Sequence, residues 1–169
     1  MTRPPIILVS LCLTGEKCLY HGGSCSFALD ILGRLREAEC QLITVCPEVL
    51  GGMTIPRAPS LWRGSRLYAR GNLEKDVTAY FERGRDLALE MLHELEELPD
   101  VALLLNNSPA CDPLRGVFGR ALSALGIYCV AAERGNAWAQ VLLGFLEGQG
   151  FTLPKPIPPK AKPSQLRLL

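Results

Sequence analysis

The chain has 169 residues, of which 48% are hydrophobic and 21% are charged, and its formal net charge at pH 7 is +1. This length and composition predict one globular domain with a single core, in an oligomeric state that the sequence leaves undefined. The net charge gives no reason to expect nucleic acid or a membrane surface as a partner, and no apolar run is long enough to span a bilayer.

Four continuous apolar runs predict buried strands, at residues 6–12, 41–46, 101–107 and 127–132. Runs without alternation are typical of parallel strands that are covered on both faces. Amphipathic helical patterns separate these runs, at residues 24–37, 76–98 and 113–125, and a last pattern begins near Asn136. Strands that alternate with helices predict an α/β fold built on a doubly wound, mainly parallel sheet.

Capping residues support the predicted helix boundaries. Ser24, Asp76 and Asp112 stand where the first three helices are expected to begin, and their side chains suit an N-cap. Pro113 suits the first position of the third helix, and Pro99 marks the end of the second.

Two segments do not fit the alternation of strands and helices. Residues 47–75 form a long connection rich in proline and glycine, within which residues 66–72 predict a small hairpin. A connection of this length is usually functional or mobile. Residues 153–169 contain five prolines, four basic residues and no acidic residue, which predicts a disordered tail after an α/β domain at 1–152.

The sequence contains seven cysteines, and we expect no signal peptide before them, because the first apolar run is short and lacks a small-residue cleavage site. The thiols are therefore expected to be cytoplasmic and reduced. Reduced thiols favour metal binding, catalysis or core packing over structural disulfides. Core packing is the interpretation for Cys40 and Cys129, and a structural role is favoured for Cys18 and Cys25.

Three other cysteines follow three predicted strands. Cys12 and Cys46 close the first two strands, and Cys111 follows the third. The carboxyl ends of parallel strands share one edge of a sheet, so these thiols are predicted to meet in one crevice. Soft thiolates select iron–sulfur clusters, zinc or copper(I). Three thiolates leave one iron of a cubane cluster open for chemistry, and zinc with three cysteines and a water is the alternative.

Four blocks of the sequence resemble the thiouracil desulfidase family. They are VSLCLTGEKCLYHGG, VCPEVLGGMTIPRAP, DVTAYFERG and NNSPAC, in that order, and the resemblance covers roughly residues 6–134. It implies a Rossmann-like fold and a 4Fe-4S cluster held by Cys12, Cys46 and Cys111. It also implies non-redox removal of sulfur from a thiolated uracil, releasing sulfide, with Glu48 and Ser108 as the catalytic residues.

The residue types suit that chemistry. Glu48 is expected to take a proton from an attacking water, and Ser108 to orient the substrate or relay the proton. Arg57 is expected to hold a carbonyl oxygen or phosphate of the substrate. Leu19 and His21 replace an arginine and an aspartate of the family pattern. The substrate is therefore less defined than the metal site, and it is a thiolated nucleobase, a nucleoside or another small thiocarbonyl compound.

Other functions remain open at this point. A noncatalytic metal-binding or sulfur-carrier module keeps the three thiols but does not need Glu48. A hydrolase with zinc on the same three cysteines is a further alternative. A plain dinucleotide-binding domain is disfavoured, because the turn after the first strand lacks the G-x-G-x-x-G spacing.

Overall fold

A four-stranded parallel sheet forms the centre of the computed structural model, which describes residues 3–71 and 75–153. The sheet order is β2-β1-β5-β6, and its strands are β1 (Ile6–Ser10), β2 (Gln41–Val45), β5 (Val101–Leu105) and β6 (Tyr128–Ala132). All three pairings are parallel. The chain adds β2 on one side of β1 and then returns to add β5 and β6 on the other, so the predicted Rossmann-like, doubly wound α/β fold is confirmed.

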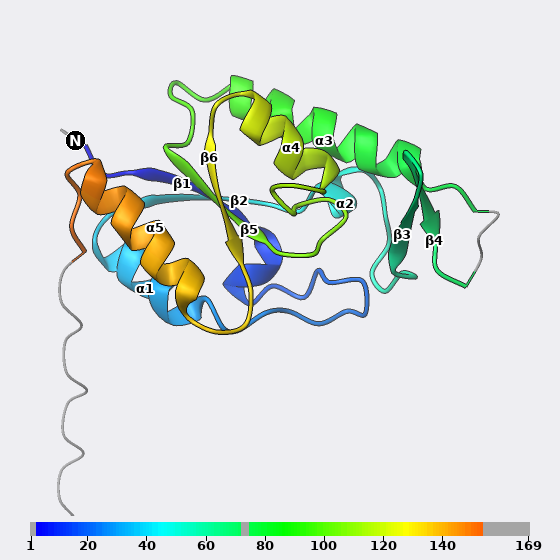
Figure 1. Ribbon diagram of the computed structural model, residues 1–169, viewed down its shortest axis with the longest axis horizontal. Coiled ribbons are helices and arrows are strands. Elements are labelled where there is room, and N and C mark those ends of the chain that lie inside the picture. The colour runs from blue at the N-terminus through cyan, green and yellow to red at the C-terminus, as the bar shows by residue number, and fades with distance from the viewer. Residues whose placement is uncertain (1–2, 72–74, 154–169) are drawn as a thin grey trace, which may run out of the picture.

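Helices cover both faces of this sheet (Figure 1). α1 (Leu29–Glu37) and α5 (Ala137–Gly148) pack on the face that Ile7 and Val9 present. α3 (Thr78–His93) and α4 (Val117–Ala124) pack on the face that Leu8 presents. Both faces of β1 are therefore buried, which explains why its sequence is continuously apolar. No helix in the described ranges is both long and apolar enough to cross a membrane.

Two predicted helix starts are wrong. α1 begins at Leu29, and no side chain caps it, so Ser24 lies in the preceding loop. α4 begins at Val117 instead of Pro113, because Asp112 holds a turn before the helix. The two oxygens of this buried carboxylate accept hydrogen bonds from three backbone amides, those of Asn107, Leu114 and Arg115.

The other two helices begin close to their predicted starts. Asp76 accepts a hydrogen bond from the amide of Thr78, 2.9 Å away, at the first turn of α3. α3 ends at His93, five residues before the predicted end, and α5 follows Asn136 as predicted. The predicted tail lies outside the described residues except for Leu153, which packs against the core and does not belong to a tail.

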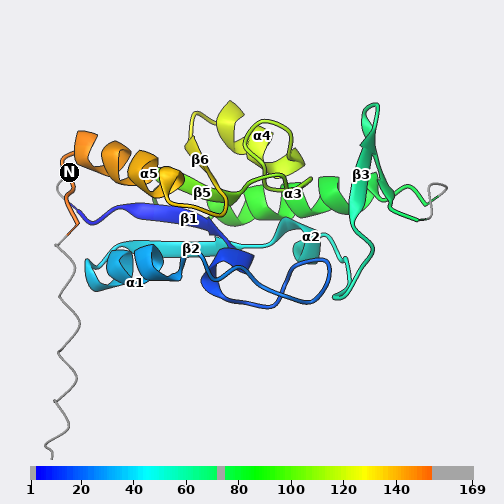
Figure 2. The ribbon, with the colours of Figure 1, turned by 60° about the horizontal axis from the view of Figure 1, so that its bottom comes forward.

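The connection after β2 has more regular structure than the sequence predicts. It contains the short helix α2 (Pro47–Leu50) and an antiparallel hairpin of β3 (Ser60–Arg63) and β4 (Arg66–Ala69). The hairpin begins six residues before its predicted position. Figure 2 shows it standing at one end of the molecule, beyond the carboxyl ends of β1 and β2. The hairpin therefore stands at the edge where ligands bind in folds of this type.

Two glycines let α2 touch the backbone of α3. A Cβ atom built on Gly51 would lie 1.9 Å from the carbonyl oxygen of Tyr80, and one built on Gly84 would lie 1.8 Å from that of Pro47. No side chain fits at such distances. The contact therefore sets the position of α2, which carries Glu48.

We expect Gly84→Ala to lower the free energy of unfolding by about 1–3 kcal/mol, because the added methyl group pushes α2 and α3 apart. Gly144→Ala in α5 is the control, since nothing lies within 4 Å of its Cβ position. It should gain up to about 1 kcal/mol from helix propensity. Urea denaturation measures both values, and equal effects of the two substitutions would show that the α2–α3 contact is not tight.

Candidate functional site

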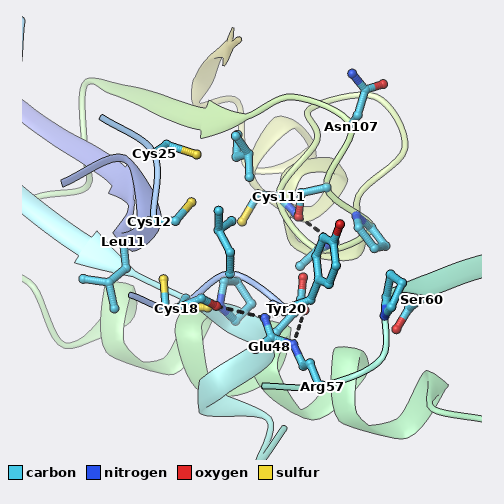
Figure 3. Close-up of a pocket in the computed structure, with 18 of the residues that line it drawn as sticks. Leu11, Cys12, Cys18, Tyr20, Cys25, Glu48, Arg57, Ser60, Asn107 and Cys111 are labelled. Carbon is cyan, nitrogen blue, oxygen red and sulfur yellow. Dashed lines mark hydrogen bonds and ion pairs between the residues drawn. The ribbon is translucent and has the colours of Figure 1, made fainter. Parts of the chain in front are cut away.

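A cavity of about 350 Å³ lies at the carboxyl ends of the strands. Its walls come from segments far apart in sequence (Figure 3): the turn after β1, the start of α2, the loop before β3 and the loop after β5. β1 occupies the centre of the sheet, with β2 and β5 on either side, so the cavity lies where the strand order reverses. In open α/β sheets this is the usual position of a ligand site.

The three predicted ligand cysteines line this one cavity. Cys12 lies in the 3₁₀ helix η1 (Leu11–Thr14) that directly follows β1, so β1 is two residues shorter than predicted. Cys46 is the N-cap of α2, directly after β2. Cys111 is buried in the loop that follows β5. Rigid strands thus deliver the three thiols to a common space.

Two more thiols line the cavity, those of Cys18 and Cys25. The amide of Cys25 donates to the carbonyl oxygen of Cys12 over 2.9 Å, which ties the loop between them back onto η1. Sequence reasoning favoured a structural role for both residues. The signal that points to the cavity is their position, because both follow Cys12 closely in an irregular segment that begins where a strand ends.

Several of the cavity thiols have raised pKa values. A hydrogen bond with Cys12 raises the pKa of Cys18 to about 12, and a hydrogen bond with Cys18, together with burial, raises the pKa of Cys46. Burial raises the pKa of Cys111 to about 12. Hydrogen bonds with the hydroxyls of Ser10 and Ser108 act in the opposite direction but are outweighed by burial. These three groups are therefore neutral thiols near pH 7 in the metal-free protein, and a metal that binds them must displace their protons.

The donor set of the cavity suits an iron–sulfur cluster, because it is rich in thiols. In the chain as described, no three side chains of His, Cys, Asp or Glu are close enough to hold one metal ion. Five thiols line the one cavity, none of them forms a disulfide, and Cys18 makes hydrogen bonds with Cys12 and Cys46. Thiolate sulfur is the ligand that iron–sulfur clusters take from proteins. Cys40, by contrast, packs in the hydrophobic core, and Cys129 donates to the carbonyl oxygen of Ile127.

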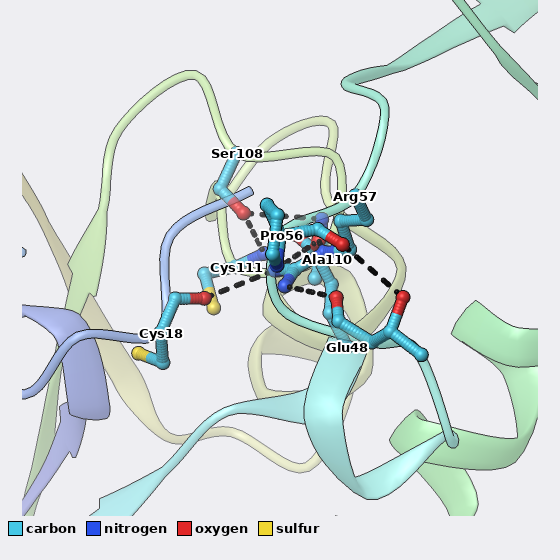
Figure 4. A network of polar contacts seen from close by, with 8 residues as sticks. Cys18, Glu48, Pro56, Arg57, Ser108, Ala110 and Cys111 are labelled. Atoms are coloured by element: carbon cyan, nitrogen blue, oxygen red, sulfur yellow. Dashed lines mark hydrogen bonds and ion pairs between the residues drawn. The ribbon is translucent and has the colours of Figure 1, made fainter. Parts of the chain in front are cut away.

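Glu48 and Arg57 form a nearly buried ion pair at the cavity wall (Figure 4). Nε and Nη2 of Arg57 both lie 2.7 Å from Oε2 of Glu48, and the two side chains are only 7% and 14% exposed. Arg57 also donates to the carbonyl oxygens of Cys18 and Thr54. The guanidinium therefore joins α2, the Cys18 loop and the segment before β3. It holds the carboxylate in one orientation.

Ser108 also lines the cavity, in the loop after β5. Its Oγ accepts hydrogen bonds from the amides of Ala110 and Cys111, at 3.2 and 3.0 Å. These bonds shape the turn that presents the Cys111 thiol. Glu48, Arg57 and Ser108 thus line the same cavity as the three thiols predicted as ligands, so the structure brings the six predicted residues together.

Comparison with known proteins identifies a family and a solved structure that this chain resembles. The sequence model of the family described as 2-thiouracil desulfurase matches residues 7–133. The uncharacterized protein YbbK of Bacillus subtilis (strain 168) is 33% identical over 112 residues, which cover 63% of this chain and 72% of that protein. The solved structure of TudS, a [4Fe-4S]-dependent thiouracil desulfidase, matches with a TM-score of 0.65 and 32% identity. The match covers 83% of this chain and 98% of that one.

Proposed function

The chain belongs to the 2-thiouracil desulfurase family, and from that premise we propose that it is a 4Fe-4S-dependent desulfidase that hydrolyses a thiolated nucleobase. In this reaction water replaces sulfur: the carbon–sulfur double bond becomes a carbonyl, sulfur leaves as hydrogen sulfide, and no electrons are gained or lost. The observation that carries the proposal is the single cavity that combines several free thiols with a carboxylate held by an arginine.

Cys12, Cys46 and Cys111 are the residues we propose as cluster ligands. Each directly follows a strand or lies in the loop after one, so its main chain is well anchored. When bound, a cluster with three protein thiolates supplies a Lewis-acidic iron toward the soft sulfur of a thiocarbonyl group. Seven free cysteines are consistent with the reducing cytoplasm that we propose as the location of the protein.

Glu48 is the proposed general base. Both of its contacts with Arg57 use Oε2, and Oε1 has no partner in the part of the chain that the structure describes. Oε1 is therefore free to accept a proton from the water that attacks the thiocarbonyl carbon. The same oxygen returns the proton to sulfur as the carbon–sulfur bond breaks.

Ser108 and Arg57 have supporting roles in this proposal. Ser108 accepts two amide hydrogen bonds, which fix its oxygen and leave the hydroxyl hydrogen to orient the substrate or relay a proton. The predicted role of contacting a substrate oxygen falls to the one N–H group of Arg57 that its contacts with the described residues leave, on Nη1. Its bonds to Glu48 add a second role, which is to hold the base in place.

The direct test is oxygen-free purification followed by metal analysis, a visible spectrum and an assay with 2-thiouracil. We expect brown protein with about four iron and four sulfide atoms per chain, and equal amounts of uracil and sulfide as products. Colourless protein with stoichiometric zinc would identify a three-cysteine zinc hydrolase instead. A bound cluster without sulfide release would identify a noncatalytic metal-binding or sulfur-carrier module.

A further inference from the structure

Tyr20 presents a large aromatic surface to the cavity that the described residues do not cover. Its side chain lines the cavity and is 45% exposed. Its carbonyl oxygen accepts a hydrogen bond from the amide of Arg57 at 2.7 Å, so its main chain is fixed to the segment that carries the arginine. The neighbouring His21 ring meets Tyr20 only edge-on. Tyr128 is similarly exposed, at 46%, but its ring is stacked on Phe145.

Ser60, which lines the same cavity, has an unsatisfied hydroxyl. It is the first residue of β3, and its Oγ is buried without a hydrogen-bond partner in the described ranges. Buried hydroxyls are nearly always paired, and the described residues supply no partner for this oxygen, so a bound ligand is a candidate for that partner. In Figure 3, Ser60 lies across the cavity from Cys12 and Cys25, and Tyr20 lies between them.

We propose that Tyr20 and Ser60 form the recognition wall for the substrate ring. The Tyr20 ring stacks on the face of a planar heterocycle, and the Ser60 hydroxyl, after rotation about its Cα–Cβ bond, bonds to the second ring carbonyl, which is meta to the thiocarbonyl carbon. This inference rests on the proposed function and narrows its substrate. A cavity of about 350 Å³ that also holds a cofactor suits a single-ring base rather than a nucleotide.

Uracil is the probe, because it is the proposed product and keeps the ring face and the second carbonyl, at C4. Calorimetry on protein purified without oxygen compares its binding with that of 2-pyrimidinone, which lacks this carbonyl. Tyr20→Leu should weaken the binding of both probes by about 10- to 100-fold, and Tyr20→Phe by less than about threefold. Ser60→Ala should weaken uracil binding by about 3- to 10-fold and leave 2-pyrimidinone unchanged.

Matched controls lie outside the cavity. Tyr128→Leu removes an equally exposed tyrosine, and Ser123→Ala removes a hydroxyl that already bonds to the carbonyl oxygen of Gly119. Neither should change the binding of either probe. Equal losses with Tyr20→Leu and Tyr128→Leu would overturn the role of Tyr20. If Ser60→Ala left the ratio of the affinities for uracil and 2-pyrimidinone unchanged, the role of Ser60 would be overturned.

The binding experiment tests the recognition wall, and the sulfide assay tests the desulfidase activity, so the two proposals can fail independently. Uracil binding that depends on Tyr20 and Ser60, in a protein that releases no sulfide from 2-thiouracil, supports the recognition wall and refutes the desulfidase. Sulfide release that survives all three substitutions, with uracil affinity unchanged, refutes the recognition wall and supports the desulfidase. Absence of uracil binding to the unsubstituted protein overturns the inference outright.

Discussion

Single replacement of Cys12, Cys46 or Cys111 by serine is expected to abolish the visible absorption of protein purified without oxygen. Each substitution removes one of the three proposed soft ligands, which line the cavity from different strand ends. A serine hydroxyl is a harder and far less acidic ligand than a thiol, so it does not replace the lost thiolate. Loss of groups that only support a ligand already costs about 10- to 100-fold in metal affinity, and loss of a ligand should cost more.

The remaining cysteines provide the controls. Cys40→Ser and Cys129→Ser lie away from the cavity and should keep the full iron content. Cys18→Ser and Cys25→Ser alter cavity thiols outside the proposed ligand set and should also keep it. Iron analysis and the visible spectrum measure all seven variants. Bleaching by Cys18→Ser with retained colour in Cys12→Ser would show that the ligand assignment is wrong.

Glu48→Gln is expected to keep the absorption spectrum and to lower kcat for sulfide release by about 10²- to 10⁴-fold. The amide keeps the shape of the side chain but cannot accept the proton of the attacking water. The ion pair with Arg57 is lost at the same time, although Gln retains an oxygen that can accept one of its hydrogen bonds. Steady-state kinetics with 2-thiouracil measure the effect, and the spectrum shows that the cluster remains.

A second carboxylate that is paired with an arginine serves as the control for Glu48. Asp86 pairs with Arg85 on the exposed side of α3, away from the cavity, so Asp86→Asn should leave kcat unchanged. Turnover of Glu48→Gln within threefold of the unsubstituted enzyme would remove Glu48 from the mechanism. Loss of colour in the same variant would instead indicate a structural effect on the ligands, since Cys46 is only two residues away.

The convergence of Cys12, Cys46 and Cys111 followed from local sequence patterns. Continuous apolar runs mark strands that are buried on both faces, and in a parallel sheet the residues just after such runs come to one edge. That inference needed no knowledge of the strand order. It tolerated errors of one or two residues at the strand ends, because a thiol that lies one turn further on still reaches the cavity.

Local patterns were less reliable where a polar side chain had more than one available partner. Asp112 suits an N-cap, yet its buried carboxylate holds the loop after β5 and the helix begins five residues later. Ser24 suits an N-cap in the same way, but α1 begins without any side-chain cap. Propensity describes which bonds a residue makes easily, and packing decides which of them forms.

The sequence by itself determined the strands, the alternation with helices and the edge at which three thiols meet, because burial and periodicity are properties of short segments. Only the tertiary structure decided that Cys18 and Cys25 join them, that Arg57 holds Glu48, and that Tyr20 and Ser60 face the same cavity. Cys18, Cys25, Tyr20 and Arg57 lie in irregular segments, and Glu48 and Ser60 lie in elements of only four residues, so none of them carries a periodic signal. Their positions depend on contacts between distant parts of the chain, such as the close approach of Gly51 and Gly84 that places α2 against α3.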